Sequence, residues 1–196
     1  MIPSAKINKS HLLEILLLAI GSLLVTVFIF NLGSIVLRSI TIQLVILIIA
    51  FNILSIIRET KMLSGDELPK ETTHQLTTLM SDTVSLKANN KKTVIYFFAP
   101  WCKVCHVSIE NLQEIYLNNQ DIDVIAVALD FESKEEILEF SKQHQLTFPI
   151  ALGNAKVKAD FKVTGYPSYY VLDADNTISG KSLGYSTELG LYLRTL

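Results

Sequence analysis

Cysteine is scarce in this chain, and so are other metal-binding side chains in a suitable arrangement. The 196 residues contain two cysteines, Cys102 and Cys105, and a zinc site that uses one such pair needs two or more further ligands. There is no second cysteine pair, and the histidines show no spacing typical of ligands. The four histidines are His11, His74, His106 and His144. We therefore expect no bound metal.

Positive charge is not concentrated anywhere in the sequence. Lys and Arg number 17 against 19 Asp and Glu, which gives a formal net charge of −2. Nucleic-acid-binding proteins carry a basic patch or stripe that contacts the phosphates. We therefore expect no nucleic-acid partner.

Charge of either sign is almost missing from the first third of the chain. Between Leu12 and Ile57 the only ionisable side chains are Glu14 and Arg38. A membrane-spanning helix needs roughly 20 apolar residues, whereas a signal-peptide core has roughly 7–15. We expect residues 1–57 to form a membrane anchor in contact with lipid, a transmembrane helical hairpin with spans at about 15–35 and 39–57. The alternative is a signal sequence followed by a buried helix.

A polar stretch at 58–75 follows the anchor and predicts a linker, and residues 76–196 then form one domain. Continuous β-branched and aromatic runs predict buried strands, and apolar residues at helical spacing predict amphipathic helices. The expected elements are a strand pair at 76–86, strands at 93–99 and 122–130, helices at 103–118 and 133–145 with Ser133 as N-cap, an extended piece at 148–152, a helix at 155–161, two strands within 168–185 and a helix at 187–196. This order predicts an α/β domain with a mixed central sheet flanked by helices.

The two cysteines stand where a predicted strand meets a predicted helix. A Cys-x-x-Cys pair in that context is typical of redox-active proteins. A structural disulfide is the alternative, but it would close a very small loop and stabilise the fold weakly. Cys102 would lie at the helix N-terminus, where the dipole and unpaired N–H groups stabilise a thiolate. We expect Cys102 to attack a substrate disulfide and Cys105 to resolve the mixed disulfide.

Two segments resemble the thioredoxin superfamily. "VIYFFAPWCKVC" resembles its active-site strand and loop, and "VTGYPSYYVLD" resembles its cis-proline segment. The intervening "ALDFESKEEILEFSKQHQLTFPIALG" resembles the helix and strand inserted in the membrane-anchored TlpA/ResA-like thiol–disulfide reductases of bacteria. The resemblance covers residues 76–196 and implies a thioredoxin-like fold and protein thiol–disulfide oxidoreductase activity.

The resemblance also implies a substrate groove and partners. Pro167, in cis, would lie opposite the cysteines, Tyr166 would offer backbone groups to an extended peptide, and Trp101 would pack beside the thiols. The partners would be a disulfide-bearing client protein and a dithiol that donates electrons. No cofactor is implied beyond the redox-active Cys102–Cys105 disulfide.

Four positions depart from the relatives or adjoin the thiols. Tyr96 stands where thioredoxins carry a buried acid, and Ser108 stands where TlpA/ResA-like proteins often carry a glutamate, so no proton-relay acid is identified. Lys103 is a candidate to lower the thiol pKa, with a solvated lysine at the helix end as an equal alternative. His106 is a second candidate for tuning the thiols, although a surface histidine is the favoured interpretation.

Other functions use the same two thiols. A copper chaperone is one alternative, because thiolates bind Cu(I). Copper-delivering proteins of this fold usually add a late histidine, and none follows His144. A membrane-tethered interaction module with a structural disulfide is another alternative. A peroxidase is not expected, because no Thr-x-x-Cys arrangement with a partnering arginine is visible.

Signals for orientation in the membrane conflict. Lys6 and Lys9 precede the first apolar segment, Arg58 and Lys61 follow the second, and Arg38 alone lies between them. The positive-inside rule therefore favours a cytoplasmic domain. The resemblance favours the periplasmic face of a bacterial inner membrane, where disulfides form and persist. We expect the periplasmic location and keep the cytoplasmic face as the alternative.

Overall fold

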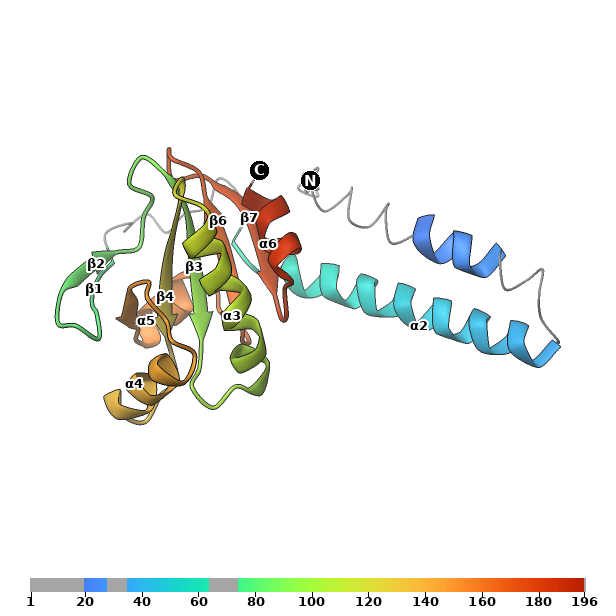
Figure 1. The fold of residues 1–196 in the computed structure, drawn as a ribbon, viewed down its shortest axis with the longest axis horizontal. Coiled ribbons are helices and arrows are strands. Elements are labelled where there is room, and N and C mark those ends of the chain that lie inside the picture. Colours follow the sequence, from blue (N-terminus) through green and yellow to red (C-terminus); the bar gives the residue numbers. More distant parts are fainter. Residues whose placement is uncertain (1–19, 28–34, 64–73, 196) are drawn as a thin grey trace. The chain divides into compact units, whose positions relative to one another are not determined.

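The computed structural model describes residues 20–27, 35–63 and 74–195. The chain divides into two compact units, Met1–Arg58 and Glu59–Leu196. The apolar helix α2 (Ile35–Glu59) accounts for most of the described part of the first unit, and a mixed sheet with its helices forms the second (Figure 1).

Helix α2 has the length and composition of a membrane span. Its segment Arg38–Glu59 has 22 residues and a mean hydropathy of 2.7, and none of its most apolar window is buried. The helix expected at 39–57 is therefore confirmed. Residues 20–27 are also helical, but most of the first expected span, 15–35, lies outside the described residues. The helical hairpin stays a prediction.

The second unit is built on a five-stranded sheet with the order β5-β4-β3-β6-β7. The central strand β3 (Lys92–Phe98) runs parallel to β4 (Ile122–Ala128) and antiparallel to β6 (Ser168–Leu172). Strand β5 (Ile150–Leu152) pairs in parallel with β4, and β7 (Ile178–Leu183) pairs antiparallel with β6. The middle strand therefore has a neighbour on each side, as its continuous apolar sequence predicts.

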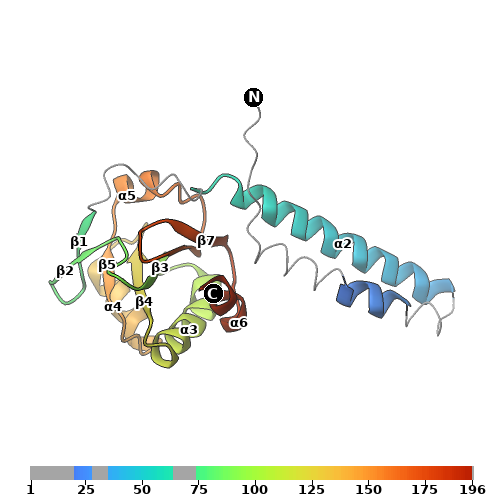
Figure 2. The same ribbon diagram turned by 90° about the horizontal axis from the view of Figure 1, so that it is seen from above.

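Helices cover both faces of this sheet (Figure 2). The core that contains Tyr96 of β3 also takes side chains from three helices, and the core that contains Ile95 takes Val157 of α5. The helices of the first core are α3 (Lys103–Asn118), α4 (Lys134–Gln143) and α6 (Glu188–Thr195), whereas the second core lies under α5 (Ala155–Asp160). The cysteine-bearing helix α3 thus packs on the same face as Tyr96.

The sequence-based elements of the domain are all present. A separate two-stranded sheet pairs β1 (Gln75–Thr77) with β2 (Thr83–Ser85), which matches the strand pair expected at 76–86 except that β1 begins one residue earlier. Helix α3 begins and ends at the predicted residues. Ser133 caps α4 as predicted, since its Oγ accepts the Glu136 N–H at 3.4 Å.

The expectation of a polar linker over 58–75 is wrong for Met62 and Leu63. Both side chains are 3% exposed and belong to the core under α5. The Leu63 N–H donates to Tyr170 Oη at 3.2 Å, and Lys181 Nζ donates to Leu63 O at 2.9 Å. The domain therefore includes residues N-terminal to 76, because this apolar pair inside a polar stretch has a core to enter. Residues 64–73 lie outside the described part of the chain.

Replacing Leu63 should test this extended domain. Leu63→Ala removes buried methyl groups, so we expect the free energy of unfolding to fall by about 2–5 kcal/mol. The exposed Leu117, 59% exposed on α3, is a matched control, and Leu117→Ala should change stability by no more than about 0.5 kcal/mol. Denaturant unfolding followed by the fluorescence of Trp101, the single tryptophan, measures both. Equal effects of the two substitutions would contradict the burial of Leu63.

Candidate active site

The segment that carries the cysteines begins where β3 ends. Strand β3 finishes at Phe98 and Cys102 is the N-cap of α3, so Ala99, Pro100 and Trp101 form the connection. The Cys102 N–H donates to Ala99 O at 3.0 Å, which closes the turn. Because β3 is buried in the middle of the sheet, its carboxyl end holds the cysteines in a fixed position.

Cys102 caps helix α3 with its sulfur. Its backbone is extended, with φ −80° and ψ 107°, and its Sγ accepts the Cys105 N–H at 3.3 Å. A helix N-terminus presents unpaired N–H groups and the positive end of the helix dipole. The Cys102 sulfur therefore lies at the N–H groups of this helix terminus.

The two thiols are free and unequally buried. Cys102 is 7% exposed, whereas Cys105, one helical turn later, is 0% exposed. Burial raises the pKa of the Cys105 thiol, and its hydrogen bond with Cys102 raises the pKa further. Cys102 is therefore the more accessible of the two thiols, and Cys105 is fully enclosed.

Asp130 joins Trp101 and Tyr166 into a rim beside the cysteines. Trp101 Nε1 donates to Asp130 O at 2.8 Å, and Tyr166 Oη donates to Asp130 Oδ2 at 2.9 Å. The Trp101 and Tyr166 rings meet edge to face with their centroids 5.9 Å apart. Lys158 forms an ion pair with the same carboxylate and holds the pKa of Asp130 below its usual range. Trp101 is nevertheless 64% exposed, so the rim presents an aromatic surface.

The Tyr166–Pro167 peptide bond is cis, as the resemblance implied. Pro167 is buried, and its carbonyl accepts the Gly184 N–H at 2.7 Å. Gly184 has φ +105°, a conformation that favours glycine. Tyr166 packs against the core cluster that contains both cysteines, and its pKa is raised chiefly by burial, with contributions from Asp130 and both cysteines.

His106 is half-buried, and both of its ring nitrogens have contacts within the protein. Its Nε2 lies 2.9 Å from Pro100 O, its Nδ1 lies 2.8 Å from His144 Nε2, and its ring packs 4.6 Å from that of Phe140. His144 Nδ1 in turn lies 3.2 Å from Glu110 Oε1. His106 therefore fixes the carbonyl of the residue two before Cys102.

Lys103 is an exposed residue at the first position of α3, and its proposed influence on the thiols remains a prediction.

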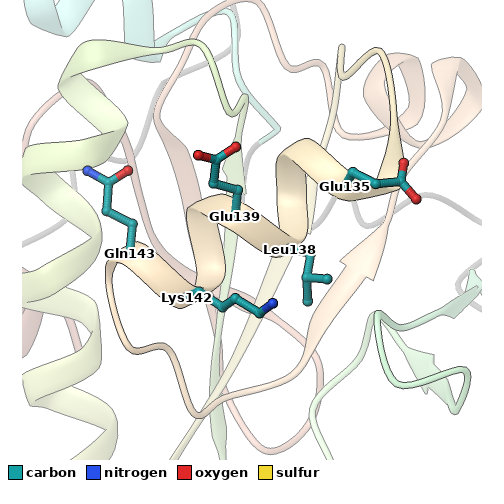
Figure 3. A pocket seen from close by; sticks show the side chains of 5 residues that line it. All are labelled: Glu135, Leu138, Glu139, Lys142 and Gln143. Atoms are coloured by element: carbon teal, nitrogen blue, oxygen red, sulfur yellow. The ribbon is translucent and has the colours of Figure 1, made fainter.

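Two hollows on the surface do not contain the cysteines. One is lined by five residues of α4: Glu135, Leu138, Glu139, Lys142 and Gln143 (Figure 3). The other follows β2 and β4 and includes Thr83 and Asp123. The side chains of Figure 3 come from one face of a single helix and bring no nucleophile together, so we assign them no chemistry.

The fold and the thiol geometry agree with comparisons to known proteins. A family model described as AhpC/TSA family matches residues 65–181, well over half of the chain. The chain belongs to the AhpC/TSA family. Within the family's matched region, Ala99 stands three residues before Cys102, so the Thr-x-x-Cys arrangement sought for a peroxidase is absent from this sequence.

Relatives of this AhpC/TSA chain confirm the TlpA/ResA-like resemblance. It is 29% identical over 135 residues to the thioredoxin-like protein YneN of Bacillus subtilis, covering 67% of this chain and 78% of YneN. It is 28% identical to the thiol–disulfide oxidoreductase ResA of Bacillus cereus, covering 65% and 74%. The crystal structure of StoA from Bacillus subtilis matches with a TM-score of 0.59 at 21% identity, covering 66% of this chain and 99% of StoA. The last match confirms the thioredoxin-like fold.

Sequence reasoning missed Asp130, Lys158 and His144. Asp130 had a usable signal, because it follows a buried strand parallel to β3, and the carboxyl ends of parallel strands lie at one edge of a sheet. His144 is the C-cap of α4 and meets His106 only through the packing of α4 against α3. Lys158 lies on α5 and reaches Asp130 across 28 residues. Neither residue has a spacing that indicates its partner.

Raising the pH should lower the free energy of unfolding of the reduced protein because of Cys105. Its pKa is raised in the native state, so the unfolded chain loses the thiol proton first as the pH passes the ordinary value of 9.0. The contribution of Cys105 to the free energy of unfolding is therefore complete below that pH and declines above it. Denaturant titrations between pH 7 and 10.5 should show a steeper loss in the reduced protein than in Cys105→Ala. Parallel curves would contradict the assignment.

Proposed function

We propose that this protein is a membrane-anchored thiol–disulfide oxidoreductase that reduces or exchanges disulfides in other proteins. The observation that carries the proposal is the unequal burial of two adjacent thiols at the start of α3, 7% and 0% exposed. A reaction through a mixed disulfide needs one sulfur that meets the client and one that meets only the first sulfur. The names of relatives such as ResA of Bacillus cereus, a thiol–disulfide oxidoreductase, support the same chemistry.

The exchange proceeds in two balanced steps. The Cys102 thiolate attacks one sulfur of a client disulfide, the S–S bond breaks, and the departing client sulfur takes a proton. Cys105 then attacks Cys102 Sγ and forms the Cys102–Cys105 disulfide. The second client sulfur leaves with the electron pair and receives the Cys105 proton. Two electrons move from the dithiol to the client, and the N–H group that bonds to Cys102 Sγ favours this sulfur as the attacking one.

The client lies along the aromatic rim in this proposal. An extended peptide pairs with the backbone at Tyr166, ahead of β6, in the manner of an added strand. Apolar client side chains then meet Trp101 together with Val104 and Val107, which are 45% and 62% exposed. Asp130 supports this arrangement by holding both aromatic side chains. Pro167 fixes the start of β6 beneath the peptide.

No bound cofactor is needed for this cycle. The dithiol stores the two electrons itself, and a partner dithiol returns the Cys102–Cys105 disulfide to the reduced form. The copper-chaperone alternative uses the same sulfurs. Among residues 20–27, 35–63 and 74–195, no three His, Cys, Asp or Glu side chains are grouped as metal ligands. No observation favours that alternative over the redox role.

Single cysteine substitutions should separate the two roles. With a disulfide-bearing peptide as substrate, Cys102→Ser should lower exchange to the uncatalysed rate, because the accessible nucleophile is lost. Cys105→Ser should accumulate the mixed disulfide at Cys102, which also allows clients to be trapped and identified by mass spectrometry. Quenched time courses analysed for protein mass give both results. Turnover by Cys102→Ser, or first alkylation at Cys105 in the reduced wild type, would reverse the assignment.

We propose further that the domain faces outward from a bacterial inner membrane. One helix, Arg38–Glu59, is long and apolar enough to provide the anchor. A thiol pair that handles client disulfides is most useful where disulfides persist. Against this stand Lys6, Lys9, Arg58 and Lys61, which favour a cytoplasmic domain if both expected segments span the membrane.

Reporter fusions at the C-terminus should decide the orientation. Alkaline phosphatase fused after residue 196 should be active, because it requires an oxidising compartment, and green fluorescent protein at the same point should be dim. Immunoblots of both fusions control for expression. Bright fluorescence with an inactive phosphatase would place the domain in the cytoplasm and show that the positive-charge bias decides the topology.

A further inference from the structure

Two hydroxyl groups are buried without a regular hydrogen bond on the face of the sheet that carries α3. Tyr96 of β3 is 0% exposed and Ser108 of α3 is 1% exposed. Within the described part of the chain, neither Tyr96 Oη nor Ser108 Oγ forms a hydrogen bond of regular geometry, although the two hydroxyls lie close enough to influence each other. A buried polar group without a regular hydrogen bond destabilises a fold, so two such groups on one face call for an explanation.

Both residues lie on the face of the sheet that carries Cys105. Ser108 follows Cys105 by three positions and therefore projects from the same face of α3. Tyr96 belongs with Cys105 to one core cluster. Burial raises the pKa of Tyr96, negative charge at Cys105 and Cys102 raises it further, and the neighbouring Ser108 hydroxyl lowers it. Tyr96 thus keeps its proton and is available as a donor when Cys105 ionises.

Other polar groups near Cys105 already have a hydrogen-bond partner or carry no charge. Tyr169, on the adjoining strand β6, shares a hydrogen bond of 3.0 Å with Ser186. The pKa of the Cys105 thiol is shifted by its burial, by Cys102 and by backbone groups, including that of Ala99. The thiol must nevertheless lose its proton in the resolving step, so the developing charge needs donors that are held nearby.

We propose that the hydroxyls of Tyr96 and Ser108 form a preorganised donor site for the Cys105 thiolate. The inference rests on the proposed exchange reaction and concerns its second step. Cys105 attacks Cys102 Sγ, the Cys102–client bond breaks, and the Cys105 proton passes to the departing client sulfur. The two hydroxyls donate hydrogen bonds to the Cys105 sulfur while it is negative. They have no regular hydrogen bond in the resting thiol form because their partner is the thiolate, as in sites that stabilise charge only where it develops.

The test separates attack from resolution in the full-length protein. Reduced protein is mixed with glutathione disulfide, and acid-quenched samples are analysed by mass for the glutathione adduct and for the internal disulfide. Tyr96→Phe should slow resolution by about 10- to 100-fold, the range expected for a hydrogen bond to a charged group. Ser108→Ala should slow resolution several-fold. Neither variant should change the rate of adduct formation at Cys102.

A stability measurement excludes a merely structural role. Removing a hydroxyl that has no regular hydrogen bond should leave the free energy of unfolding of Tyr96→Phe equal to or above that of the wild type. Tyr170→Phe is the matched control, because Tyr170 is buried on the opposite face and its hydroxyl donates to Phe161 O at 2.6 Å. That variant should lose stability and resolve the adduct at the wild-type rate.

Failure of the donor site and failure of the exchange reaction give different results in these experiments. Resolution by Tyr96→Phe at the wild-type rate overturns the donor site, and so does an equal slowing of attack and resolution. A wild-type protein that forms neither the adduct nor the internal disulfide overturns the proposed exchange reaction together with this inference.

Discussion

The burial of the Cys105 thiol is the constraint on which the rest of the site depends. A sulfur with 0% exposure cannot meet a client protein, so another sulfur must stand between it and the solvent. Cys102 can do so because it caps α3 one turn earlier and lies at the end of the buried central strand. Burial also disfavours the charged form of the inner sulfur. The donor site proposed at Tyr96 and Ser108 would offset this penalty with hydrogen bonds.

The aromatic rim depends on a second constraint, the parallel pairing of β3 and β4. Phe98 pairs with Ala128 in the sheet, and the Leu129 N–H donates to Phe98 O at 2.8 Å. The residues that follow the two strands therefore emerge together, and Trp101 meets Asp130. Asp130 has φ +48°, a left-handed conformation that Asp tolerates better than most residues. Its carbonyl accepts from Trp101, and its carboxylate binds Tyr166 and Lys158.

Local patterns in the sequence carry much of this architecture. The apolar run of β3 and the helical spacing from Lys103 to Asn118 predict these two elements and place both cysteines at the start of a helix, because such patterns are local properties. The thioredoxin-like fold followed from the resemblance of two segments to that superfamily. The contact of His106 with His144 was not accessible in this way, since it forms only when α4 packs against α3. The sequence predicts a linker at Met62 and Leu63, because the burial of a short apolar pair depends on the folded core that it contacts and not on its neighbours in the chain.

The shared core of Cys105 and Tyr96 links oxidation to folding through a thermodynamic cycle. The difference in unfolding free energy between the oxidised and reduced protein equals the difference between forming the disulfide in the folded and in the unfolded chain. The loop from Cys102 to Cys105 is too short for chain entropy to contribute much, so this difference reports the contacts around the two sulfurs. For a two-electron couple, about 1.4 kcal/mol corresponds to about 30 mV. Side-chain packing beneath α3 is therefore also a means of setting the reduction potential of the Cys102–Cys105 pair.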